Sequence, residues 1–194
     1  LCMSIVDKEN QIAVIGGGSG DISLWKTCAG EESLIKKTVL GSGFPIVAVA
    51  STPQLILAGM VMPGRHSSFV VILDHALEEL YRQEVDREML SNMTCFGNMV
   101  VTTFQNHTIR LWHCDSREMA PIRRETHIPT QSMQAVGDFL ITSSPKRSNL
   151  CVWSSNTLNP ICTIETTQPV KCHAILGNYM AVLTDDELVS FWSA

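Results

Sequence analysis

Ile109-Arg110-Leu111-Trp112 is one of four segments in the chain that read aliphatic, small or polar, apolar, tryptophan. The other three are Ile22-Ser23-Leu24-Trp25, Leu150-Cys151-Val152-Trp153 and Val189-Ser190-Phe191-Trp192. A fifth copy, Val70-Val71-Ile72-Leu73, has leucine in the last position. The last residues of the five copies lie 48, 39, 41 and 39 residues apart, and all four tryptophans of the chain fall in this register. A period of about 40 residues indicates a repeat protein.

Further strand-like segments precede and follow these tryptophan segments at nearly fixed distances. The runs just before them, which are rich in β-branched residues and bounded by turn residues, predict strands buried on both faces at 12–16, 55–59, 99–103, 139–143 and 180–184. Further strands are expected earlier in the units, at 46–51, 91–96, 132–136 and 170–176, with tight turns at 96–98, 136–138 and 176–178. After each tryptophan segment a more polar strand is expected, as at 34–40, 119–126 and 160–166, whose polarity suits an outer edge exposed to water.

Residues 77–87 allow two interpretations. A helix would place Leu77, Leu80 and Tyr81 on one face. The repeat register instead predicts a polar outer strand there. We favour the strand because it continues the pattern of the other units.

Four strands in each unit of about 40 residues are typical of a β-propeller blade. In its Ile-x-Leu-Trp strand, in the small residue that ends the preceding strand and in its period, the chain resembles the WD-repeat β-propeller family over essentially its whole length. The prediction is an all-β fold made of four-stranded antiparallel blades, with a single propeller domain over residues 1–194. Five blades are expected, at about residues 1–42, 43–87, 88–127, 128–168 and 169–194, and the last unit ends without a fourth strand.

The polar tetrad of the family is largely missing. The resemblance implies a His from a Gly-His pair, a Ser or Thr, an Asp in the loop before the third strand, and the Trp. The chain has no Gly-His pair, and six positions before the anchor residue only the fifth unit has aspartate, at Asp186. The other units carry Ser19, Ser67, Asn106 and Arg147 there. We therefore expect the blades to rely on apolar packing more than on buried polar networks.

The resemblance also implies a closed ring of seven or eight blades. Five blades, one of them without its outer strand, leave the ring incomplete. The chain also begins without an initiator methionine. We expect it to be a piece of a larger propeller.

Composition narrows the function. Fourteen Lys and Arg against 19 Asp and Glu give a net charge of −5, and no dense basic tract offsets it, which disfavours nucleic acid as a partner. No apolar run approaches the length of about 18 residues that a membrane helix needs. No signal peptide is visible. The seven cysteines are scattered without a C-x-x-C pair, which favours reduced thiols in a cytoplasmic protein, with the nucleus as the other candidate compartment.

A glycine-rich stretch, residues 16–20, follows a predicted strand and invites comparison with a phosphate-binding loop. The Rossmann pattern needs a third glycine where Asp21 stands, and no Lys-Ser or Lys-Thr closes the stretch as in a P-loop. A strand ending at Trp25 follows instead of a helix, so no helix N-terminus faces an anion. The interpretation is a hairpin loop.

The spacing of the His, Cys, Asp and Glu residues does not indicate a metal site or a catalytic site. His113-Cys114 and Cys172-His173 fall in different units and lack the close pair of ligands that zinc sites show. Asp185-Asp186-Glu187 places three carboxylates side by side in one turn, whereas acid–base catalysis needs them facing one another across a substrate. We therefore predict no enzyme activity, no metal, no cofactor and no small-molecule substrate.

The loops between second and third strands carry the candidate binding residues. The distance from the start of the second strand to the anchor of the third is 13 residues in units one, three and five, 14 in unit four and 18 in unit two. Unit two therefore has a protruding loop over residues 62–68, and unit four has residues 145–148 at the equivalent place. We hypothesise a positive patch for an acidic or phosphorylated peptide, made of Arg65, His66, His107, Lys146 and Arg147. The alternative is that these charges only keep the protein soluble.

The resemblance implies a non-catalytic scaffold for protein–protein interaction, either in a multi-subunit complex or as the recognition part of a larger chain. Two other functions stay open. A propeller enzyme would gather polar residues in its central channel, but first-strand residues expected there are mainly apolar or small: Val47, Val49, Met93, Met133, Ala135 and Ala174. A structural domain that docks inside its own parent protein would show an exposed apolar edge at one or both ends of the ring.

Overall fold

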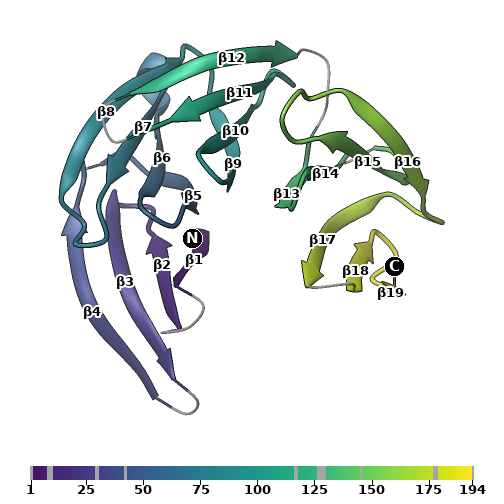
Figure 1. Cartoon of the computed structure of the whole chain (residues 1–194), viewed down its shortest axis with the longest axis horizontal. Helices are drawn as coiled ribbons and strands as arrows, with labels where there is room; N and C mark the ends of the chain where they lie inside the picture. The colour runs from purple at the N-terminus through teal and green to yellow at the C-terminus, as the bar shows by residue number, and fades with distance from the viewer. Residues whose placement is uncertain are drawn as a thin grey trace.

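A computed structural model describes residues 2–7, 11–28, 31–41, 43–115, 118–125, 130–144, 146–176 and 179–193. These residues form a five-bladed propeller of antiparallel sheets, four of them with four strands and the fifth with three. Figure 1 shows the blades following one another in an arc, with blade 1 and blade 5 at its two ends. No helix in the described part of the chain is long and apolar enough to cross a membrane.

Each blade is one sheet in sequence order. Blade 1 contains β1 (Cys2–Asp7), β2 (Ile12–Gly16), β3 (Asp21–Cys28) and β4 (Glu31–Val39). Blade 2 contains β5 (Ile46–Ser51), β6 (Ile56–Met62), β7 (Ser67–Leu73) and β8 (Glu79–Asp86), with the short 3-10 helix η1 (Pro63–Arg65) between β6 and β7. Blade 3 contains β9 (Leu90–Phe96), β10 (Met99–Phe104), β11 (Ile109–Cys114) and β12 (Met119–Glu125).

The last two blades follow the same order. Blade 4 contains β13 (Ser132–Val136), β14 (Phe139–Ser143), β15 (Asn149–Ser154) and β16 (Pro160–Glu165). Blade 5 contains β17 (Val170–Leu176), β18 (Tyr179–Thr184) and β19 (Val189–Ser193). The predicted all-β fold and its five units are confirmed, and in the part of the chain that the structure describes the fifth blade has three strands. The segment 77–87 contains a strand, β8, and not a helix. The predicted turn at 176–178 has two of its residues outside the described ones.

The first strands form the inside of the arc, where β1 packs against β5, β5 against β9, β9 against β13 and β13 against β17. One apolar cluster lies at each interface between successive blades. Third-strand side chains of each blade enter the cluster shared with the next blade: Ile22 and Leu24, Val70 and Ile72, Ile109 and Leu111, and Leu150. The anchor residues Leu73, Trp112 and Trp153 enter the cluster shared with the preceding blade. The repeated apolar pattern follows from these interfaces, because blades 2, 3 and 4 bury both of their faces against neighbouring blades.

A bulge between third and fourth strands recurs in all four complete blades. Trp112 pairs with Pro121 while the preceding Leu111 pairs with Arg123, so that Ile122 is skipped. The same step skips one residue in each of the other three blades, and the four skipped residues are all aliphatic: Ile35, Leu80, Ile122 and Ile161. Each of them is between 43% and 52% exposed. The four outer strands thus share an aliphatic residue at the bulge, although their sequences otherwise differ.

Blades 3 and 4 keep a polar contact at the anchor tryptophan. Trp112 Nε1 donates a hydrogen bond to Thr102 Oγ1 at 2.8 Å, and Trp153 Nε1 donates one to Thr142 Oγ1 at 2.9 Å. Both threonines lie in the second strand and are buried. The expectation of mainly apolar packing therefore has an exception, because the indole N–H of a buried tryptophan needs an acceptor.

Candidate functional site

The predicted binding residues lie in hairpins between the second and third strands of blades 2, 3 and 4. Arg65 ends η1 and His66 follows it in the left-handed conformation, with φ of 48°. His107 lies between β10 and β11, and Lys146 and Arg147 lie between β14 and β15. All five side chains are exposed. Since equivalent hairpins of successive blades leave the sheets at the same end, these residues share one end of the propeller, which we call the loop face.

Backbone and small polar side chains hold these hairpins in place. Ser68 Oγ donates to the carbonyl of Glu88 at 2.6 Å and accepts from the Leu90 N–H at 2.7 Å, which ties the base of the blade 2 loop to blade 3. The His107 N–H donates to the Phe104 carbonyl at 3.0 Å. The loop tips are therefore fixed by contacts at their bases, while the charged side chains extend into solvent.

The structure brings the predicted residues to one end of consecutive blades but records no hydrogen bond or ion pair between them. The three ion pairs found among the described residues involve other groups, at Lys36, Lys37 and Arg82. The loop residue at position 145, which the sequence included in the blade 4 loop, lies outside the described residues. The binding role of the loop face stays a prediction.

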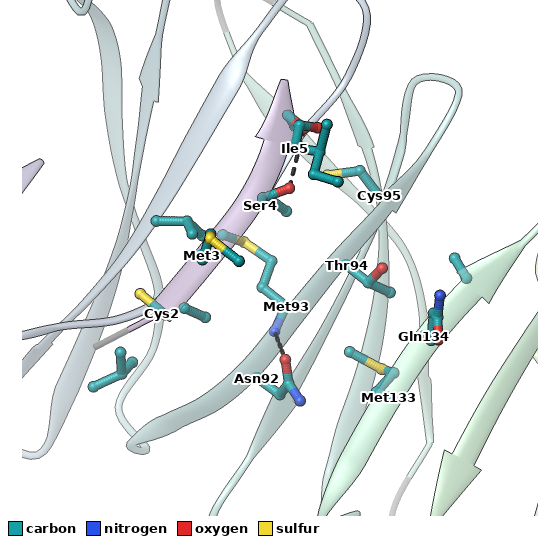
Figure 2. A pocket seen from close by; sticks show the side chains of 16 residues that line it. Cys2, Met3, Ser4, Ile5, Asn92, Met93, Thr94, Cys95, Met133 and Gln134 are labelled. Atoms are coloured by element: carbon teal, nitrogen blue, oxygen red, sulfur yellow. Dashed lines mark hydrogen bonds between the residues drawn. The ribbon is translucent and has the colours of Figure 1, made fainter. Parts of the chain in front are cut away.

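A cavity of about 540 Å³ lies at the centre of the arc, lined by β1, β5, β9 and β13. Figure 2 shows side chains from these strands around it, among them Met3, Met93 and Met133. Val47, Val49 and Ala135 also line it, as predicted, whereas Ala174 is not among its lining residues. No Asp, Glu, His, Lys or Arg is found among the described residues that line the cavity.

The polar groups of this channel are used within the fold. Ser51 Oγ donates to the Ile5 carbonyl at 2.7 Å and thereby joins blade 2 to blade 1. Gln134 donates to the Ile175 carbonyl at 3.1 Å and accepts from the Ile175 N–H at 2.9 Å, joining blade 4 to blade 5. Asn92 Oδ1 accepts from the adjacent Met93 N–H, as the dashed line in Figure 2 shows. The contacts of Ser51 and Gln134 thus tie neighbouring blades together, whereas that of Asn92 stays within β9.

One serine–histidine pair escaped the sequence analysis. Ser132 Oγ of β13 lies 2.7 Å from His173 Nδ1 of β17, across the interface between blades 4 and 5. Burial lowers the pKa of His173 to about 4, against a smaller opposing effect of the Ile141 backbone. The Nε2 atom is buried and has no hydrogen-bond partner. The two residues are 41 apart in the sequence and carry no motif, so the sequence offered no signal for the pair.

This pair does not resemble a catalytic dyad in its surroundings. Neither Ser132 nor His173 lines the central cavity. A catalytic base of this kind is usually oriented by a third group on its other ring nitrogen, and here that nitrogen, Nε2, has no partner. The arrangement instead fits a neutral histidine that ties two blades together.

The glycine-rich stretch and the acidic cluster noted in the sequence both lie at hairpins between strands. Gly16 ends β2, residues 17–20 form the turn between β2 and β3, and β3 follows as a strand. Asp185, Asp186 and Glu187 lie exposed in the turn between β18 and β19. Within the ranges that the structure describes, no group of three or more His, Cys, Asp or Glu is placed to hold a metal ion.

No protein-family model matches the sequence, and no curated protein matches it. Solved structures share its fold. The β-propeller domain of Cps50 (Swd1) from Myceliophteria thermophila aligns with a TM-score of 0.72 at 12% identity, over 99% of this chain and 70% of that chain. A chain of the Mitotic Checkpoint Complex aligns with a TM-score of 0.73 at 11% identity, over 99% of this chain and 60% of that one.

A third solved structure, BamB from Moraxella catarrhalis, aligns with a TM-score of 0.71 at 11% identity, over all of this chain, 100%, and 59% of that chain. The chain thus spans about three fifths of the length of the checkpoint and BamB chains. At these identities the likeness shows a β-propeller and no particular function.

Proposed function

We propose that this propeller is a WD-repeat protein and a non-catalytic platform for protein–protein interaction. The observation that carries the proposal is the loop face. Blades 2 and 4 present exposed cationic side chains, Arg65, Lys146 and Arg147, from the hairpins between their second and third strands, and two hydrogen bonds of Ser68 fix the base of the blade 2 hairpin. Loops on a rigid scaffold are where repeat proteins bind.

The partner chemistry follows from these side chains. Arginine offers bidentate hydrogen bonds to carboxylates and phosphates, so an acidic or phosphorylated peptide of another protein is the ligand we propose. A structural neighbour belongs to a complex, the Mitotic Checkpoint Complex, which supports proteins as partners. The net charge of −5 weighs against nucleic acid. Membrane insertion and a small-molecule substrate are not part of the proposal, and its cytoplasmic location rests on the cysteine usage.

The experiment is affinity purification of the natural full-length protein from its own cells. It is run beside a variant with Arg65, His66, Lys146 and Arg147 all changed to Glu. Thermal melting checks first that both proteins fold equally. We expect specific partners to disappear with the substitutions, and an unchanged partner list would contradict the loop face as the binding site. A matched control changes Lys26 to Glu, because this exposed cation lies toward the end of β3 that is opposite the hairpins between second and third strands.

A second candidate function, docking inside the parent protein, is favoured by the two end blades. On blade 5, Val189 is 54% exposed and Phe191 is 78% exposed, although their equivalents in the other blades are buried against the next blade. On blade 1, Met3 is 65% exposed and Ile5 is 57% exposed. Apolar surface of this kind usually marks a contact. If fusion of the chain to its natural flanking sequence raises its melting temperature, this function gains support, whereas unchanged melting contradicts it.

An enzyme with a site in the propeller channel is the least supported of the three candidate functions. Its site would lie in the central cavity, and the described lining contains no acid, base or cation there apart from the thiols of Cys2 and Cys95. Burial raises the pKa of both thiols, which opposes nucleophilic chemistry.

A further inference from the structure

The hairpins of the loop face differ in charge from blade to blade. In blade 1 the carboxylate of Asp21 lies 3.0 Å from Lys37 Nζ and also accepts a hydrogen bond from Ser19 Oγ, so its charge is compensated within the blade. The blade 2 hairpin carries the exposed guanidinium of Arg65. The blade 3 hairpin, residues 105–108, contains no Asp, Glu, Lys or Arg. The loop face is therefore cationic at blade 2 and uncharged at blade 3.

Blade 4 carries the second cationic hairpin. Lys146 and Arg147 are both exposed, and none of the ion pairs found among the described residues involves either of them. Glu165 at the end of β16 is exposed as well and lies near this hairpin, because it pairs with Asn149 at the start of β15. Two cations thus stand against one carboxylate, and the hairpin keeps a net positive charge.

A whole blade separates Arg65 from the cations of blade 4. Blades 2, 3 and 4 follow one another along the arc (Figure 1). Sheets that pack face to face lie about 10 Å apart, so hairpins two blades apart are separated by roughly 20 Å or more. An extended chain advances about 3.3 Å per residue and needs about seven residues to cover this span. The two hairpins therefore form two cationic sites rather than one.

The blade 5 hairpin has the opposite charge. Asp185, Asp186 and Glu187 are exposed, and Thr184 Oγ1 donates a hydrogen bond to Asp186 Oδ1 at 2.5 Å. Lys171 Nζ donates to the Asp185 carbonyl at 3.3 Å and compensates only part of this charge. We assign no ligand to this hairpin. Its effect is repulsive, because an anionic group that extends from blade 4 over blade 5 would meet like charges.

We propose that the loop face recognises a segment of a partner protein with two anionic residues about seven positions apart, one at Arg65 and the other at Lys146 and Arg147. The segment crosses the uncharged blade 3 hairpin and has no acidic residue where it passes over blade 5. Two contacts made by one segment bind more tightly than either alone, because the linker sets a high effective concentration for the second contact. This inference rests on the proposed function and deepens it by naming the charge pattern of the peptide.

The test uses the natural full-length protein and dye-labelled peptides that are otherwise uncharged and blocked at both ends. One peptide has a single phosphoserine, and two others have two phosphoserines that are either two or about seven positions apart and so carry the same total charge. The same set with glutamate in place of phosphoserine separates recognition of phosphate from recognition of carboxylate. Fluorescence anisotropy measures the dissociation constant of each peptide.

The protein variants remove one cationic hairpin at a time. They are Arg65→Gln and the double variant Lys146→Gln with Arg147→Gln. These side chains are exposed, so we expect the fold to be kept, and thermal melting checks this. The matched control is Lys26→Gln, because Lys26 is an exposed cation toward the opposite end of β3.

We expect the peptide with the longer spacing to bind wild type at least about 10-fold more tightly than the peptide with the shorter spacing or the single phosphoserine. This preference is expected to vanish in Arg65→Gln and in the blade 4 variant, because only one cationic hairpin remains, and to persist in Lys26→Gln. Equal binding of the two spacings to wild type, or no binding of any peptide, would overturn the proposal.

Two longer peptides test the acidic hairpin. Each has one added glutamate, about seven positions beyond one or the other phosphoserine. We expect the addition at one end alone to weaken binding, because that end lies over blade 5 and the other lies over blade 1, where Lys37 compensates Asp21. Equal effects of the two additions would overturn the repulsive role of blade 5.

Failure of this inference is separable from failure of the proposed function. If the two spacings bind wild type equally, and both bind more weakly to the Arg65 and blade 4 variants but not to Lys26→Gln, the loop face remains the binding site and only the two-site inference fails. Unchanged cellular partners of the variant with all four loop residues changed to Glu would instead contradict the loop face itself.

Discussion

Trp112 Nε1 donates a hydrogen bond to Thr102 Oγ1 at 2.8 Å, in a site where neither side chain is more than 3% exposed. The pair joins the third strand of blade 3 to its second strand, and the tryptophan ring packs in the cluster shared with blade 2. An indole N–H buried here without an acceptor would carry its full desolvation cost. The contact therefore links sheet formation to blade packing.

Thr102→Val is expected to destabilise the protein by about 1–3 kcal/mol, because it keeps the shape of the side chain and removes the acceptor. Thr142→Val is the matched control. Its partner Trp153 is half-buried and can reach water, so we expect a loss below about 1 kcal/mol. Urea unfolding followed by circular dichroism measures both. Equal losses would show that burial of the indole does not decide the effect.

Gly20→Ala is expected to destabilise blade 1 by roughly 2–4 kcal/mol. Gly20 has φ of +85°, and a Cβ there would lie 2.0 Å from the Gly41 carbonyl oxygen, so the backbone would have to move. Gly18 in the same turn has open space around it, and we expect Gly18→Ala to change stability by less than about 0.5 kcal/mol. Thermal melting of the two variants checks this contrast, which similar melting temperatures would contradict.

The stability of the protein is expected to fall as the pH drops from about 6.5 to about 4 through the titration of His173. Burial lowers the pKa of the folded imidazole, so in this window the unfolded chain binds more protons than the folded one. The contribution has a slope of at most about 1.4 kcal/mol per pH unit. It is fully present above the pKa of the unfolded state.

The measurement for His173 is urea unfolding at several pH values, for wild type and for His173→Asn. Asparagine cannot titrate and still offers a hydrogen-bonding group to Ser132. Because carboxylates titrate equally in both proteins, the difference between the two curves isolates the histidine. Parallel curves over the whole window would contradict the assignment.

The tryptophan register made most of the fold predictable. It located the third strands. The apolar runs at regular distances from them predicted β5, β13 and β17 with their observed bounds. It also decided residues 77–87 correctly, because the period outweighed a local apolar pattern that fits a helix. Periodicity works here because the same positions in successive blades form the interface with the next blade along the arc.

What the sequence could not provide are contacts between blades. The hydrogen bond between Ser132 and His173 depends on the angle between two sheets, which no local pattern encodes. The bulge residues were hidden for a different reason. Ile35, Ile122 and Ile161 look like ordinary members of polar outer strands until the pairing shows that each is skipped. The loop residues were placed at one end of the blades, but their mutual distances depend on side-chain positions.

The central claim, that the loop face binds partner proteins, is tested most directly by hydrogen exchange on the complex recovered from cells. The account predicts slower exchange on binding at residues 62–68, 105–108 and 146–148, with the β12 and β16 strands unchanged. Protection absent from these loops and confined to other surfaces would contradict the claim.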